Sequence, residues 1–363
     1  MKIGLISDGN LRGTNPADKI HELVHEAILA EEYGFSCWGT SETHFVAPYA
    51  TITAPDAIYG AVAAKTEEIM IRWMALVITY NHPVQVAERL NTLDVLSNGR
   101  AELCTARGNN IKVVETFNVE LEHSRPMWDE SMKIIGKSLT SESVTYDGKY
   151  WQLDDVPILP RPVQDPPPAL LVVSSGIESH IAAAELGIGV ISFDNYLGWG
   201  AVEERIAAYK NNLPSKQPVA GEATEIFSYY VASAHCAETR AKALEEAAPR
   251  AFEFVDFVLD DLYAPLLGKT SYEYMEQIQA VQSYRRDLDK LMGLGPSIVA
   301  GDPDDVTASL KELEKRGVDE VILSIDGISH EKHMKAIELI GKHVLPEFHG
   351  KAESRPTAGA VSG

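Results

Sequence analysis

The sequence predicts a (β/α)₈ TIM barrel, an α/β fold in which eight parallel strands alternate with helices. Short apolar runs recur along the chain, and each is followed by a segment with the periodicity of an amphipathic helix. Eight such units fit a chain of 363 residues, which suits one barrel with insertions better than an open doubly wound sheet. The run 69–78 is dense in apolar residues, as a parallel strand buried on both faces should be.

The expected strands are short apolar runs, and three of them end at Ser. In chain order they are 2–7, 36–41, 69–78, 101–106, 169–174, 190–193, 226–232 and 320–325. Each is followed by a helix-like segment, and these segments are 16–33, 55–65, 83–96, 126–139, 178–186, 202–210, 237–257, 303–316 and 330–344.

Proline and glycine mark several helix ends. Pro83 suits a first helical turn, where its missing N–H has no partner, and Gly34 stops the first helix. The spacing predicts that the buried face of the first helix carries Ile20, Leu23, Val24, Ala27 and Ala30. The same spacing in the third helix predicts one buried stripe made of Val84, Ala87, Leu90, Leu93 and Leu96.

Insertions are expected after strands four and seven. A polar excursion, 109–125, separates strand four from its helix, and long excursions are usually functional. A hairpin and proline-rich insertion spans 143–168. The tyrosine-rich segment 259–295 is either an extra helical pair or a lid over the site. One domain of residues 1–349 is therefore expected, with a flexible tail at 350–363.

Charge and cysteine content limit the function classes. The chain has 32 Lys plus Arg against 53 Asp plus Glu, a formal charge of −21 that repels nucleic acid and anionic membranes. Cys37, Cys104 and Cys236 are odd in number and lie in or beside apolar runs, which predicts buried free thiols and a cytoplasmic location. We expect neither a signal peptide nor a membrane span, because no run approaches the roughly 20 apolar residues of a span.

The active site of such a barrel lies at the C-terminal ends of the strands. The candidate tips are Asp8, 42–45, 74–77, 106–110, 174–179 and Asp194. Arg107 offers a planar fork of donors that suits a phosphate, and Gly108 lets a ligand approach the backbone. The loop 175–179 adds Gly176, a serine hydroxyl and a helix N-terminus, which also suit a phosphate. Either feature alone is commonly a surface charge or an ordinary cap, but together they indicate an anion site.

Other site types lack their patterns. A His-x-His metal motif is absent from the first strand tip, His21 and His25 lie on a helix remote from any tip, and His330 and His333 open the last helix, so no metal is expected. No Gly-x-Ser-x-Gly elbow is present. The Gly-x-Gly patterns lack the context of a dinucleotide-binding fold.

Six segments in register resemble the bacterial luciferase-like flavin monooxygenase family over nearly the whole chain. They are SETHF (41–45), NHP (81–83), LDVLSNGRAELCTARG (93–108), the SR pair at 124–125, the loop 175–179 and GDPDDV…GVDEVIL (301–323).

This resemblance implies reduced FMN at the barrel mouth, supplied by a separate flavin reductase, and a reaction with O₂ that oxygenates a small organic substrate. Arg107 and Arg125 match positions that bind the FMN phosphate. Met74 and Ala75 match a site that often carries a non-prolyl cis bond beneath the flavin. The full set of cofactor-binding residues implied by the resemblance is Met74, Ala75, Ala106, Arg107, Arg125, Val173, Ser175, Gly176 and Ser179.

His44 and Glu42 are the expected catalytic residues. His44 matches the second His of the luciferase pattern Glu-His-His-Phe, and an imidazole near neutral pKa can transfer a proton. Thr43 stands in place of the first His, and Ala106 stands at the reactive cysteine position, with Cys104 two residues earlier. These departures argue against the bioluminescent reaction and leave the phosphate side of the match intact.

Two alternatives stay open on the sequence. The family also contains enzymes that use the deazaflavin F420 for hydride transfer, whose phosphate ends are alike. The missing first His is compatible with a non-catalytic flavin-binding partner subunit. A homodimer or larger homo-oligomer is expected in each case.

Overall fold

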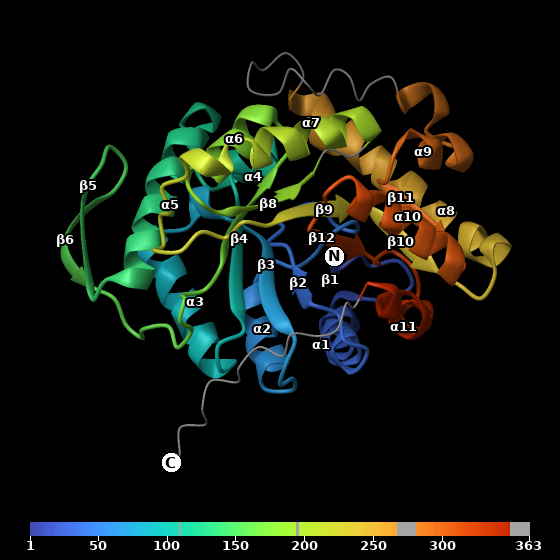
Figure 1. Ribbon diagram of the computed structural model, residues 1–363, viewed down its shortest axis with the longest axis horizontal. Helices are drawn as coiled ribbons and strands as arrows, with labels where there is room; N and C mark the ends of the chain where they lie inside the picture. The colour runs from blue at the N-terminus through green and yellow to red at the C-terminus, as the bar shows by residue number, and fades with distance from the viewer. Residues whose placement is uncertain (109, 194–195, 267–280, 349–363) are drawn as a thin grey trace.

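Eight parallel strands close into a barrel in the order β1-β12-β9-β8-β7-β4-β3-β2 in the computed structural model, which confirms the predicted fold (Figure 1). The structure describes residues 1–348 apart from 109, 194–195 and 267–280. The barrel strands are β1 (Lys2–Ile6), β2 (Cys37–Thr40), β3 (Met70–Val77), β4 (Ala101–Ala106), β7 (Leu170–Ser174), β8 (Gly189–Ser192), β9 (Phe227–Val231) and β12 (Glu320–Ser324).

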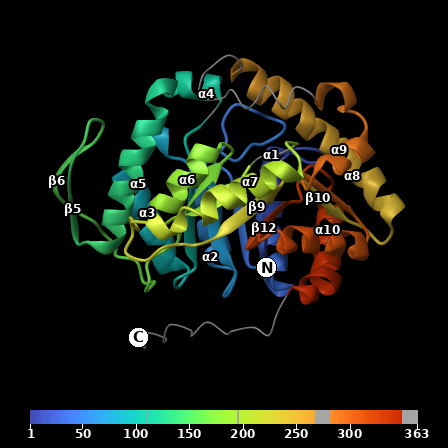
Figure 2. The same cartoon turned by 45° about the horizontal axis from the view of Figure 1, so that its top comes forward.

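The helices of the repeating units surround this barrel (Figures 1 and 2). They are α1 (Pro16–Glu32), α2 (Pro55–Ala63), α3 (Pro83–Leu96), α5 (Ser124–Thr140), α6 (Ile177–Glu185), α7 (Trp199–Lys210), α8 (Arg240–Asp256), α10 (Pro303–Lys315) and α11 (His330–Leu339). Four of them begin with proline. The Asn15 side chain caps α1, and Asp302 and Asp305 form a capping box on α10, so local sequence sets these starts.

Short turns of 3₁₀ or π helix connect or extend these helices. They are η1 (Ile78–Tyr80), η2 (Leu121–His123), η3 (Leu213–Ser215), η4 (Phe257–Tyr263), η5 (Ala264–Leu266), η7 (Ile340–Val344) and η8 (Leu345–Glu347). η7 extends α11 to Val344, where the sequence predicts the end of the last helix, and η8 follows it directly.

The insertion after β4 has two parts. The excursion 109–125 contains a short helix, α4 (Ile111–Thr116), that the sequence reading left out. The antiparallel hairpin of β5 (Ser143–Asp147) and β6 (Gln152–Pro157) then stands outside the barrel. In both views the hairpin lies beside α5, at the end of the molecule opposite α8 (Figures 1 and 2).

The insertion after β9 contains two strands that are not among the expected strands. β10 (Ser233–Cys236) pairs in parallel with β11 (Ile298–Gly301), outside the barrel. The chain leaves the ladder with β12 after Val231 and joins this second sheet two residues later. The helix expected from 237 therefore begins at Arg240, where the Thr239 hydroxyl accepts from the backbone of Lys242. α9 (Leu288–Leu294) follows, while 267–280 of the expected lid lies outside the described residues.

Two residues expected on buried faces are exposed. Ile20 is 47% exposed and Leu96 is 59% exposed. In α1 the side chain of Lys19 is buried instead. Its ammonium lies 2.9 Å from Glu22 and 3.8 Å from both Glu26 and Asp326. Apolar spacing alone misplaces Ile20 because a paired cation can take a core position when its charge is balanced.

A buried ion network lies near the N-terminal ends of the barrel strands. Arg72 of β3 donates from Nε to Glu102 of β4 at 2.8 Å and from Nη1 to Glu320 of β12 at 2.5 Å. Ser228 of β9 donates to Glu320 at 2.6 Å. The Arg72 guanidinium holds the pKa of Glu320 below its usual range although burial alone would raise it. Charged side chains therefore fill this end of the barrel, opposite the strand tips.

All three cysteines are free and buried, as predicted. Across the part of the chain that the structure describes, we find no helix with both the length and the apolar character needed to cross a membrane. The tail predicted at 350–363 lies outside the described residues.

Candidate functional site

A cavity of about 430 Å³ lies at the C-terminal ends of the barrel strands. Its lining includes every residue that the sequence assigned to catalysis or cofactor binding: Glu42, His44, Met74, Ala75, Ala106, Arg107, Arg125, Val173, Ser175, Gly176 and Ser179. Asp8 and Ser174 of the other strand tips also line it, whereas Asp194 lies outside the described residues. The barrel thus brings together the residues assigned to catalysis and cofactor binding, although the first and last of them, Glu42 and Ser179, are 137 positions apart in the chain.

One end of the cavity gathers groups that attract negative charge. Arg125, in the first turn of α5, donates from Nη1 to the hydroxyl of Ser179 at 3.2 Å. Ser179 lies in the first turn of α6, where no side chain among the described residues caps the helix at Gly176. The N–H groups at the start of a helix and the helix dipole favour negative charge. Arg107 follows β4 and lines the same cavity.

Two neighbours orient Arg125. Its Nε donates to Asp129, one turn later in α5, at 3.2 Å, and its guanidinium lies 5.5 Å from the centre of the Trp128 ring. Both contacts limit the rotamers of a long side chain, so the guanidinium is held in place before a ligand arrives.

His180 braces the loop that leads into α6. Its Nδ1 lies 2.8 Å from the carbonyl oxygen of Gly176 and 3.0 Å from the hydroxyl of Ser174, and its Nε2 lies 3.0 Å from the hydroxyl of Ser192. Burial lowers the pKa of His180 to about 4, so the ring is neutral near pH 7. Sequence reasoning missed this residue, although its position four residues after Gly176 predicts an inward-facing side chain on the first turn of the helix.

The floor of the cavity comes from β3 and β4. The peptide bond between Met74 and Ala75 is cis, as the family resemblance predicted. The carbonyl oxygen of Ala75 accepts from the backbone N–H of Glu42 at 2.9 Å, which joins the tips of β2 and β3. Cys104 is fully buried and is absent from the described lining, and burial raises the pKa of its thiol, which keeps it protonated.

Glu42 and His44 lie together, with different surroundings. The Glu42 carboxylate accepts from the backbone N–H of Val77 at 3.0 Å and from the side chain of Asn81 at 3.2 Å. His44 Nε2 lies 3.5 Å from Glu42, at the outer limit of a hydrogen bond. The His44 ring instead packs edge-on against Phe117, with centroids 5.0 Å apart. Glu42 therefore ties two strand tips together, and His44 retains polar atoms for a ligand.

An aromatic wall forms the side of the cavity near the insertion after β9. Phe193 and Tyr230 have ring centroids 5.0 Å apart, and Phe254 lies 6.4 Å from Phe193 and 6.3 Å from Phe257. Leu262 of η4 completes this side. Sequence reasoning missed the wall, because Phe254 and Phe257 sit near the end of a helix that was read only as part of the barrel repeat.

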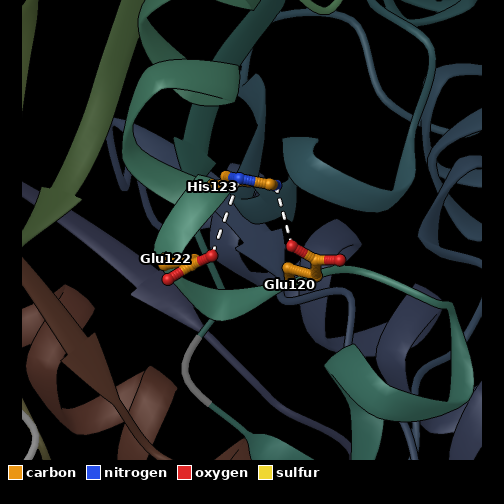
Figure 3. Close-up of side chains that lie close together, drawn as sticks. All are labelled: Glu120, Glu122 and His123. Atoms are coloured by element: carbon orange, nitrogen blue, oxygen red, sulfur yellow. Dashed lines mark ion pairs between the residues drawn. The ribbon is translucent and has the colours of Figure 1, made fainter.

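One group of possible metal ligands is found among the described residues, at the surface near η2. The nitrogens of His123 lie 3.2 Å from Glu120 and 3.8 Å from Glu122 (Figure 3). Both carboxylates are exposed, and exposed carboxylates commonly pair with a histidine without any ion. We assign no metal site to this group.

Comparison with known proteins gives the following matches. The sequence model of a family described as luciferase-like monooxygenase matches residues 1–320. The oxygenase component of flavin-dependent trigonelline monooxygenase from Acinetobacter baylyi is 24% identical over 347 residues, which cover 90% of this chain and 89% of that protein. F420-dependent glucose-6-phosphate dehydrogenase from Amycolatopsis mediterranei is 26% identical over 342 residues, which cover 90% of this chain and 94% of that protein.

Other matches show how much of a relative's length this chain covers and which fold it shares with a solved structure. The chain spans about half the length of two uncharacterised proteins from Sinorhizobium fredii, 53% and 48%. The crystal structure of monooxygenase RslO1 from Streptomyces bottropensis superimposes with a TM-score of 0.78 at 22% identity, over 96% of this chain and all (100%) of that one. This likeness supports the barrel fold.

Proposed function

This chain belongs to the luciferase-like monooxygenase family, and on that premise we propose that it is a flavin-dependent monooxygenase. It would take reduced FMN from a separate flavin reductase and use O₂ to oxygenate a small organic substrate. Similar proteins include a flavin-dependent monooxygenase and an F420-dependent dehydrogenase, so an oxidoreductase with a flavin-type cofactor is the broader statement that the comparisons support.

The contact of Arg125 with Ser179 beside the uncapped start of α6 carries the proposal. Two guanidinium groups, a hydroxyl and a helix N-terminus can neutralise the dianionic phosphate of FMN. Glu178 lines the same cavity and Asp129 pairs with Arg125, so two carboxylates near this end disfavour an anion. Arg107, Arg125, the Ser179 hydroxyl and the helix terminus nevertheless supply the donors that fit the phosphate.

The remaining lining has distinct tasks in this proposal. Met74, Ala75, Ala106 and Val173 would hold the ring system, and Ser175 and Gly176 would complete the phosphate side. When bound, reduced FMN supplies the electrons with which O₂ is activated. The aromatic wall would bind an apolar substrate and exclude water. His44 would hold or move a proton at its Nε2, and Glu42 would fix the loop from which His44 reaches the cavity.

F420-dependent hydride transfer is the second candidate, because a relative with that activity aligns over 90% of this chain. We further propose a homo-oligomer and, since free thiols suit a reducing compartment, a cytoplasmic location.

A cofactor titration tests the proposal. The purified protein is titrated without oxygen with photoreduced FMN and, in parallel, with reduced F420, and each complex is then mixed with O₂ and a panel of apolar substrates. We expect binding of reduced FMN, O₂ uptake and a product that carries one oxygen atom. Binding of F420 alone would establish the second candidate. Bound reduced FMN that is oxidised with release of H₂O₂ and without an oxygenated product would indicate a non-catalytic flavin-binding subunit.

Arg107→Ala gives a sharper test of the phosphate end. Loss of one charge-assisted contact should weaken FMN binding by about 2 kcal/mol, which is roughly 30-fold, with little change in the melting temperature of the apoprotein. Arg125→Ala should act similarly. Lys149→Ala is the matched control, because it removes an exposed cation from the distant β5–β6 connection. An FMN affinity that stays within about twofold in both arginine variants would show that the phosphate lies elsewhere.

A further inference from the structure

Three polar side chains form a continuous row of hydrogen bonds along one side of the cavity. The hydroxyl of Ser41 lies 2.6 Å from Oδ1 of Asp8 and 2.6 Å from the hydroxyl of Thr43. Asp8 follows β1, and the other two residues follow β2. All three line the cavity, and none belongs to the phosphate end described above.

The number of protons on Asp8, Ser41 and Thr43 fixes the direction of the hydrogen bonds between them. If Asp8 is ionised it can only accept, so Ser41 donates to Asp8 and Thr43 donates to Ser41. The Thr43 oxygen then offers only lone pairs to the cavity. If Asp8 carries a proton, it can donate to Ser41, Ser41 can donate to Thr43, and the hydroxyl proton of Thr43 turns toward the cavity. The charge of Asp8 thus decides whether Thr43 presents a donor or an acceptor.

The surroundings of Asp8 favour a proton on its carboxyl. Asp8 is half-buried, and removal from bulk water is the largest influence that raises its pKa. The hydrogen bond from Ser41 lowers the pKa, the charge of Asp326 after β12 raises it, and Arg250 of α8 lowers it. Tyr230 of β9 lies 3.5 Å from Oδ2 and lowers it least. The balance of these groups leaves the pKa of Asp8 above its ordinary value.

We propose that Asp8, Ser41 and Thr43 form a proton relay that delivers a proton to an oxyanion formed in the cavity. This inference rests on the proposed function and adds an acid to it. Thr43 occupies the position at which the luciferase pattern has its first histidine, so the relay gives this chain a proton donor where an imidazole is missing.

The transfer balances in one concerted step. Asp8 gives its proton to Ser41, Ser41 gives its own to Thr43, and Thr43 gives its own to the oxyanion, so three O–H bonds break and three form. The negative charge moves from the oxyanion to Asp8. A proton from solvent then restores the acid form of Asp8.

The first test measures the protonation state of Asp8 in the protein alone, with neither cofactor nor substrate present. Infrared spectra of the protein are recorded as a function of pH. We expect the carbonyl band of a protonated carboxylic acid at a pH above the ordinary pKa of an aspartate, and we expect Asp8→Asn to remove it. Asp56→Asn is the control, because Asp56 is a partly exposed carboxylate paired with Arg89. If Asp8→Asn removes no band at this pH, Asp8 is not a stored acid and the relay is excluded.

The second test asks whether the proton passes through the hydroxyl groups of Ser41 and Thr43, by measuring product formation in variants that lack them. Thr43→Val keeps the shape of the side chain and removes the hydroxyl, while Thr43→Ser keeps the hydroxyl. We expect Thr43→Val and Ser41→Ala to slow product formation by about 10-fold or more and to abolish the alkaline limb of its pH profile, with FMN affinity unchanged. Thr43→Ser should retain both rate and profile. Equal rates and profiles for Thr43→Val and Thr43→Ser would overturn the relay.

The two tests separate this inference from the proposed function. A protein that shows the Asp8 band but does not oxygenate with reduced FMN would refute the proposed function and retain the stored acid. A protein that oxygenates normally as Thr43→Val would refute the relay and retain the proposed function.

Discussion

His44 reaches the cavity from a loop whose shape is fixed by its neighbours. Glu42 is bound by Val77 and Asn81, and the ring of His44 rests on Phe117. These contacts leave the imidazole with only a long contact, 3.5 Å, to Glu42. A side chain held in this way can exchange a proton with a ligand at little cost in structure.

His44→Ala should therefore lower turnover by about 100-fold, a typical contribution of a general acid or base, while FMN affinity stays nearly unchanged. His44→Gln should restore little of the rate if His44 transfers a proton, and much of it if a hydrogen bond is enough. Steady-state product formation together with FMN titration provides the measurement. Wild-type turnover of the alanine variant would remove His44 from the mechanism.

His180 makes the loop that leads into α6 sensitive to acid. Its folded pKa of about 4 lies below the ordinary value of 6.5, so protons bind more tightly to the unfolded chain. The stabilisation is fully present above about pH 6.5 and is lost as the pH falls toward 4, by up to about 3 kcal/mol. Chemical denaturation of wild type and His180→Gln from pH 7 to 4 checks this. We expect a weaker pH dependence in the variant, and identical slopes would contradict it.

At the scale of whole elements, the insertion after β9 contributes the aromatic wall through α8 and η4. Leu262 is 7% exposed, and Leu291 of α9 is fully buried. Replacing 259–295 with a short linker would therefore remove part of the core as well as any cover over the mouth. The lid hypothesis stays a prediction, and single side chains test it more cleanly than a deletion.

Phe257→Ala and Leu262→Ala should open the apolar side of the cavity to water. Because a dry site protects reactive oxygen species from decay, we expect a larger share of the O₂ consumed to appear as H₂O₂, with FMN affinity preserved. Parallel assays of O₂, H₂O₂ and product give the coupling ratio. Phe252→Ala is the matched control, since Phe252 lies on α8 and is absent from the described lining. Unchanged coupling in both variants would show that this wall serves packing only.

The sequence was informative about elements where local signals agreed. Proline, capping residues and apolar runs located all eight barrel strands and the starts of several helices. β10 was not predicted because only one residue separates it from β9, so a single apolar run covers two strands with different partners. Periodicity wrongly placed Ile20 and Leu96 in the core. It cannot show that a paired lysine is buried in place of Ile20, or that Leu96 is exposed at the end of its helix.

The site was predictable to a similar degree, for a different reason. Strand tips converge in any closed barrel, so Arg107 and Ser179 could be brought together from topology and resemblance. His180, the aromatic wall and the chain from Asp8 to Thr43 depend on side-chain directions and on contacts between distant segments. Those contacts carry no local signature in the sequence.

For the molecule as a whole, the buried network of Arg72 links four strands of the barrel. Arg72→Met should lower the free energy of unfolding by about 3–5 kcal/mol, because Glu102 and Glu320 would lose their buried counter-charge. The depressed pKa of Glu320 adds stability that is present above its ordinary pKa and is lost as the pH falls through the lower folded value. Urea denaturation at several pH values measures both effects. A change below about 1 kcal/mol would show that the network is balanced by other groups.

The pairing of β1 with β12 has a consequence for biosynthesis. Lys2–Ile6 is made first, yet its partner on this side, Glu320–Ser324, emerges from the ribosome more than 300 residues later. At roughly 5–20 residues per second, the nascent chain waits at least about 15 seconds with an open sheet edge. The cavity, whose lining includes Ile6 of β1 and Ile322 of β12, therefore forms only after β12 has emerged, and a chaperone that shields the waiting edge would raise the yield of folded protein.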